Sequence, residues 1–244
     1  MCQVSYAPVD YDLLPRDQDV EMARKARSPE GSFMAGLGAE WPPLDMTDAT
    51  ARELVKIVGN GTARIKREAS EEAFKEDLRG GKPNSVCFLT HGYADTSDPL
   101  GKSCLAFVGA NVPQNKKNTV DDGLLTGFEI TSLDMKRVNL VYHAACMTGY
   151  GIPKGGEGIM SLRRAFHSAG VRDLVSTLFP VRQGPMMATT EMFFRNAVKG
   201  IPPDEALRAA KLSVIAEMRS GRYMGDKTNR FPHPLIWAGP VLSR

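Results

Sequence analysis

One histidine and one cysteine in this sequence each end an apolar segment. His91 follows the run SVCFLT, and Cys146 follows the run VNLVYHAA. A cysteine nucleophile attacks as its thiolate and needs an imidazole that takes and returns a proton, and the two side chains can come from distant positions in the chain. If the two segments are neighbouring strands, His91 and Cys146 form a nucleophile and base in one cleft.

A buried role for Cys146 is the alternative. Free cysteine is among the most buried residue types and packs as a small apolar side chain, and its reactivity depends on surroundings that a sequence does not show. His91 is followed by Gly92, and a glycine lets a ligand approach the backbone closely because it has no Cβ. The residues alone leave both interpretations open.

The elements that must position these side chains alternate along the chain. Apolar residues at helical spacing, with caps and glycine stops, predict helices over 47–58, 71–79, 159–169, 185–198 and 203–219. Compact apolar runs predict strands near 3–6, 63–66, 85–90, 103–109, 138–145, 173–179 and 234–242. Residues 122–135 predict a turn and a short helix, and the first forty residues are otherwise irregular.

Apolar strands that alternate with amphipathic helices indicate one α/β domain, with a largely parallel sheet and helices on both faces. Ligands of such sheets bind beyond the carboxyl ends of the strands. The predicted ends of segments 85–90 and 138–145 deliver His91 and Cys146 to this edge. The fold class is therefore compatible with a catalytic pair.

Composition excludes several classes of function. The net charge is +3, and basic and acidic residues are interspersed along the chain. The densest basic segment, RIKRE, contains no aromatic residue, so we expect no nucleic-acid partner. The sequence has neither an apolar run long enough to span a membrane nor a signal-like start, so we expect a cytoplasmic protein with no membrane partner. The four cysteines share no metal-ligand spacing, and we expect no metal and no cofactor.

The other histidines and Trp41 have structural interpretations. His143 lies three residues before Cys146 on the same predicted strand, so alternation turns the two side chains to opposite faces, and His143 is expected to be packed. His167 is expected on the solvated side of its helix, and His233 in a turn. Trp41 is taken as structural.

An ordered set of motifs covers nearly the whole chain: LTHGYADTSDPLGKSCLAF, DGLLTGFEI, ACMTGYG, GGEGIMSLRRAFHSAGVRDLVSTLFPV and HPLIWAGPVL. This set resembles the CHAT domain family, which is caspase-like and related to caspases and separase. The resemblance implies a three-layer caspase-like α/β fold over residues 47–244. Residues 1–46 are then expected to be an irregular segment that packs on this domain.

The resemblance also implies an activity, that of a cysteine endopeptidase. His91 matches the family's catalytic histidine, and Cys146 matches its nucleophile. The backbone N–H groups of Gly92 and Cys146 are the expected oxyanion hole. The substrate is expected to be a protein or peptide, and no third acidic residue is required.

Two departures from the family bear on substrate choice. Met147 stands where the family usually has glutamate, and Arg182, Gln183 and Gly184 occupy the segment where it commonly has an acid. A buried substrate arginine needs a charged partner. We expect Met147 and Gln183 to be substrate-binding residues, and because neither is charged, the substrate side chain at this site is expected to be neutral or apolar. Met186 and Met187 either line the same pocket or belong to the core face of a helix, and the pattern favours the core.

The same departures support a second hypothesis, a catalytically silent module that acts as a protein-binding or signalling component. In either case the chain carries no helical repeats of the kind that often accompany this domain. We therefore expect control by a regulatory partner on a separate chain, by dimerisation, or by cleavage in the polar segment 112–123.

Overall fold

The computed structural model describes residues 3–7, 11, 41–44, 47–112, 121–145, 152–154, 158–221 and 232–244. Its centre is a six-stranded sheet in the order β11-β10-β7-β3-β1-β2. All neighbouring pairs are parallel except β10 and β11. The strands are β1 (Gln3–Ala7), β2 (Thr62–Ile65), β3 (Ser85–Phe88), β7 (Leu140–His143), β10 (Asp173–Thr177) and β11 (Pro240–Ser243).

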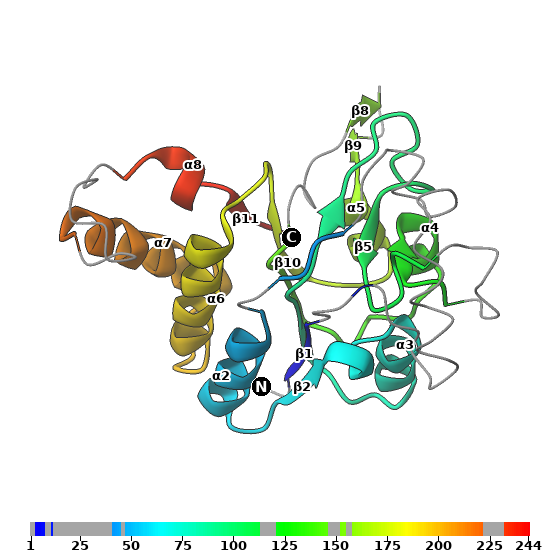
Figure 1. Cartoon of the computed structure of the whole chain (residues 1–244), viewed down its shortest axis with the longest axis horizontal. Coiled ribbons are helices and arrows are strands. Elements are labelled where there is room, and N and C mark those ends of the chain that lie inside the picture. Colours follow the sequence, from blue (N-terminus) through cyan, green and yellow to red (C-terminus); the bar gives the residue numbers. More distant parts are fainter. Residues whose placement is uncertain are drawn as a thin grey trace.

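Helices cover both faces of this sheet (Figure 1). One face carries α2 (Thr47–Val58), α6 (Gln183–Ala197) and α7 (Pro203–Arg219), and the other carries α3 (Glu71–Arg79), α4 (Gly127–Thr131) and α5 (Leu162–Ser168). The predicted α/β fold with a largely parallel sheet between two helical layers is confirmed. The bounds predicted for α2 and α7 are those observed.

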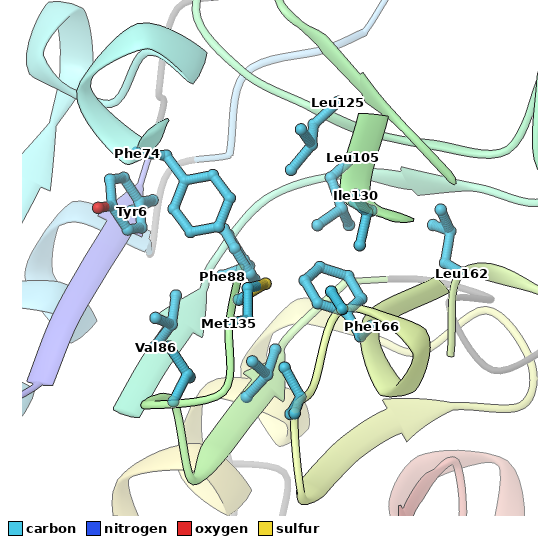
Figure 2. Packing of buried hydrophobic residues seen from close by; sticks show 14 of the residues in the cluster. Tyr6, Phe74, Val86, Phe88, Leu105, Leu125, Ile130, Met135, Leu162 and Phe166 are labelled. Carbon is cyan, nitrogen blue, oxygen red and sulfur yellow. The ribbon is translucent and has the colours of Figure 1, made fainter. Parts of the chain in front are cut away.

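Two apolar clusters hold the layers together. Figure 2 shows the first, where Tyr6, Phe74, Phe88 and Phe166 gather between the sheet and the helices α3 and α5. The Phe74 and Phe88 rings meet edge to face with centroids 5.2 Å apart. The second cluster packs α2, α6 and α7 on the opposite face. Full burial of one such side chain contributes about 1.5–3 kcal/mol, so both helical layers are firmly attached.

The strand predicted near 103–109 is confirmed as β5 (Cys104–Ala106), but it lies outside the central sheet. It pairs antiparallel with β4 (Gly92–Tyr93) and with β6 (Leu124–Thr126). The segment predicted as a turn and short helix therefore contains β6 as well as α4. Gly123 allows this pairing, because its φ is 84° and a Cβ there would meet the Ala110 nitrogen at 2.6 Å.

Three further short elements differ from the sequence prediction. The glycine-rich segment after Cys146 contains the hairpin of β8 (Ile152–Lys154) and β9 (Gly158–Met160). The predicted strand over 234–242 divides into helix α8 (Pro234–Trp237) and β11, because Pro234 begins a helix turn that the His233 side chain caps. A short 3-10 helix, η2 (Lys66–Glu68), follows β2.

Candidate active site

Strands β3 and β7 are neighbours, as a shared cleft for His91 and Cys146 requires. Phe88 is the register partner of His143, and the Ala144 amide donates to the Phe88 carbonyl at 2.8 Å. Both strands therefore end at the same edge of the sheet. Cys146 and Met147 lie outside the described residues.

The chain that leads to Cys146 is attached on its other side to β10. The Thr177 hydroxyl donates to the Ala145 carbonyl at 2.5 Å, and both residues are buried. Phe88 and Thr177 therefore hold Ala144 and Ala145 from the two flanking strands.

The His91 imidazole lies between two aromatic rings. The ring centroids of Tyr11 and Trp41 are 5.4 Å and 5.3 Å from that of His91. The His91 Nε2 atom is 2.8 Å from the Pro42 carbonyl oxygen. A carbonyl only accepts hydrogen bonds, so Nε2 carries the proton, and in the neutral ring Nδ1 keeps its lone pair.

Burial sets the protonation state of His91. It lowers the pKa of His91 below its ordinary value near 6.5, and the Pro42 carbonyl, which favours the protonated ring, acts in the opposite direction. Because the pKa is lowered on balance, the imidazole is neutral at pH 7. A neutral ring with a lone pair on Nδ1 can act as a general base.

The backbone of Gly92 faces away from β5. The Ala106 amide donates to the His91 carbonyl at 3.0 Å, and Gly92 is the register partner of Leu105. In an antiparallel ladder successive residues turn their N–H groups to opposite sides. The Gly92 N–H therefore points away from this ladder, where it can donate to another group.

Over residues 17–244 the sequence matches the model of the CHAT domain. The chain belongs to the CHAT domain family.

Two solved structures resemble this CHAT domain. The Arg-specific cysteine proteinase gingipain R (RgpB) is 10% identical with a TM-score of 0.49, and the match covers 92% of this chain and 44% of that chain. A complex of the RgpB pro- and mature domains of Porphyromonas gingivalis is 9% identical with a TM-score of 0.49, covering 92% and 45%. The CHAT domain thus spans less than half of those chains. A comparison with curated proteins gave no match.

Gln183 is the first residue of α6, a few residues after β10. Because β10 is paired with β7, the segment that leads to Gln183 leaves the sheet at the same edge as β3 and β7. Met186 and Met187 are buried in the cluster under α6. The core interpretation of these two methionines is confirmed.

The described cysteines of the CHAT domain are unsuited to nucleophilic attack. Cys87 and Cys104 are both buried, and burial raises the pKa of each thiol well above its ordinary value. A thiol of raised pKa carries little thiolate at neutral pH. Cys2 and Cys146 are the two cysteines that lie outside the described residues.

The remaining histidines have structural roles. His143 is completely buried and contacts the Phe88 and Phe166 rings, as predicted. His167 differs from the prediction, because its ring lies between the Val171 carbonyl at 2.9 Å and the Ser243 hydroxyl at 2.8 Å. It therefore joins α5 to β11 and is half-buried.

The sequence did not indicate that Tyr11, Trp41 and Pro42 lie around His91. The sequence predicts a structural role for Trp41 but not its contact with the His91 ring. The described ranges contain no group of three His, Cys, Asp or Glu side chains that could hold a metal ion. No helix among the described residues is long and apolar enough to cross a bilayer.

Proposed function

We propose that this CHAT domain is a cysteine endopeptidase in which Cys146 is the nucleophile and His91 the general base. The observation that carries the proposal is the orientation of His91. Its Nε2–H is bound by the Pro42 carbonyl, so the basic Nδ1 is available at the end of the strand beside β7. Imidazoles fixed in one tautomer are typical of catalytic pairs.

In this mechanism, His91 Nδ1 accepts the Cys146 thiol proton, and the thiolate sulfur attacks the carbonyl carbon of the scissile peptide. The N–H groups of Gly92 and Cys146 stabilise the resulting oxyanion. The imidazolium then donates its proton to the leaving amine, which departs as the C–N bond breaks. Water, deprotonated by His91, hydrolyses the acyl-enzyme and restores the thiol.

Met147 and Gln183 set the preference for the side chain before the scissile bond. The Gln183 Nε2 atom is buried and has no hydrogen-bond partner in the part of the chain that the structure describes. An uncharged amide cannot neutralise a desolvated guanidinium, so the substrate side chain is neutral or apolar. The substrate is a protein or peptide, and a regulatory protein on a separate chain controls access to it.

A catalytically silent, protein-binding module is the second candidate function. It is favoured by Met147 and by the segment from Arg182 to Gly184, which lack the acidic residues common in the family. In that case the orientation of His91 is retained without turnover.

Labelling of Cys146 distinguishes the two functions. A thiol-reactive peptidyl acyloxymethyl ketone with leucine at its terminal position is expected to label the wild-type chain but not Cys146→Ala. The variant His91→Asn is expected to be labelled about 100-fold more slowly, the effect of losing a general base. Cys87→Ala, in the separate apolar cluster under α6, is the control and keeps wild-type labelling. Unlabelled Cys146 in a folded wild-type chain would exclude the peptidase.

A further inference from the structure

The Asn111 side chain binds both backbone groups of Trp41. The Trp41 amide donates to Asn111 Oδ1 at 2.8 Å, and Asn111 Nδ2 donates to the Trp41 carbonyl at 3.0 Å. A planar carboxamide that engages both backbone groups of one residue holds that residue as a neighbouring strand would. Trp41 therefore has a defined position and orientation.

Asn111 also holds the second ring that flanks His91. Its backbone amide donates to the Tyr11 carbonyl at 3.0 Å. Tyr11 in turn reaches Thr90, the residue before His91, with 3.1 Å between the two hydroxyl oxygens. One residue thus connects the two aromatic neighbours of the imidazole, which come from separate segments of the chain.

The polar attachment of Trp41 depends on Asn111. Among the described residues the buried Trp41 indole N–H has no hydrogen-bond partner, and its ring packs against residues such as Cys104, Ala106 and Leu124. Pro42 follows Trp41 directly, and the proline ring restricts the backbone there. The two hydrogen bonds between Asn111 and Trp41 therefore fix the backbone next to Pro42, and with it the position of the Pro42 carbonyl.

We infer that Asn111 is a positioning residue for His91. By holding Trp41 and Tyr11 it keeps the Pro42 carbonyl against Nε2, and so determines the tautomer and the orientation of the imidazole. The catalytic consequence rests on the proposed peptidase function. The structural consequence, a fixed Nε2–H, does not.

Substitutions at Asn111 separate its two bonds. Asn111→Ala removes both. Asn111→Asp has nearly the same shape and keeps the acceptor for the Trp41 amide, but it places a carboxylate oxygen against the Trp41 carbonyl. Asn139→Ala is the matched control. Asn139 is exposed and lies at the opposite edge of the sheet, and its hydrogen bonds to Asn84 and Asp173 are made by its backbone, which the substitution keeps.

The direct test is NMR of the full chain labelled with ¹⁵N-histidine, which contains four histidines. A ring N–H resonance that disappears in His91→Asn is assigned to His91. We expect this proton to be protected in the wild type and in Asn139→Ala. In Asn111→Ala it should exchange with water at least about 10-fold faster, because its acceptor is no longer held. Asn111→Asp should be intermediate, and it replaces Asn111→Ala if that variant does not fold.

Unchanged protection of the His91 ring proton in folded Asn111→Ala would overturn the inference, whatever the activity of the chain. Kinetics provide a second measurement once peptide hydrolysis is established. A misplaced base should lower kcat by about 100-fold with little change in KM. A fall in kcat with an unchanged His91 resonance would also contradict a positioning role. A chain without peptidase activity would refute the proposed function and leave the NMR test intact.

Discussion

Phe88 and His143 are register partners in the parallel ladder between β3 and β7, and their rings meet edge to face with centroids 5.5 Å apart. His91 lies three residues beyond Phe88, and Cys146 lies three residues beyond His143. Both strands therefore end at the same edge of the sheet, and each proposed catalytic residue follows one member of this register pair by the same number of residues. The proposed pair depends on the register of one strand pair.

The activity should persist at mildly acidic pH. Because burial lowers the pKa of His91 below 6.5, the imidazole stays neutral, and able to accept a proton, at pH values where an exposed histidine is already half charged. We expect kcat/KM for a peptide to fall on the acid side with a midpoint below 6.5. A pH–rate profile measures this midpoint, and a value above 6.5 would contradict the proposed environment of His91.

Gln183 should control the charge preference of the proposed substrate site. Gln183→Asp introduces a carboxylate, which can pair with a desolvated substrate guanidinium. Cleavage after arginine should increase by about 10-fold or more, the effect of about 1.4 kcal/mol, in a peptide library that varies this position. Gln183→Asn is the neutral control and should leave the preference unchanged. Failure of Gln183→Asp to increase cleavage after arginine counts against Gln183 as a pocket residue.

His143 should make the fold sensitive to acid. Burial lowers the pKa of His143 to about 3, whereas in the unfolded chain it is near 6.5. Between these values the unfolded state binds more protons, so the free energy of unfolding falls as the pH decreases, by up to about 1.4 kcal/mol per pH unit.

Denaturant unfolding between pH 4 and pH 7 tests this dependence. His143→Leu should flatten the slope, since it removes the titrating group from the core. Phe166→Leu changes the ring that contacts His143 without removing the imidazole, and it should retain the wild-type slope. Equal slopes in the wild type and in His143→Leu would show that other groups cause the acid sensitivity.

Thr177 should stabilise the segment that leads to Cys146. Thr177→Val removes the hydroxyl that donates to the buried Ala145 carbonyl, so the free energy of unfolding should fall by about 1–3 kcal/mol. Thr189→Val is the matched control: Thr189 is also buried, but its hydroxyl bonds the Pro185 carbonyl, four residues earlier in the same helix. That carbonyl keeps its helical partner, so the control should cost less. Equal losses in the two variants would contradict a special role for Thr177.

Helices and central strands were predictable because their patterns are local. In α2 and α7 the apolar spacing and the acidic residues of the first turn lie within the element itself, and α7 begins at Pro203. The errors fall where a short segment depends on a distant partner. Strand β6 has three residues and exists through its pairing with β5, and His167 is half-buried because Ser243 lies beside it.

The sequence by itself determined the family, the layered α/β fold and the residue types that can form a nucleophile and a base. His91 and Gly92 can be identified from the sequence because they follow a predicted strand, at the edge of the sheet where ligands bind. Only the tertiary structure decided how His91 is held. Its partner is the backbone carbonyl of Pro42, its flanking rings come from Tyr11 and Trp41, and Asn111 connects them. Every residue has a backbone carbonyl, so no residue type marks the one that the folded chain brings to the imidazole.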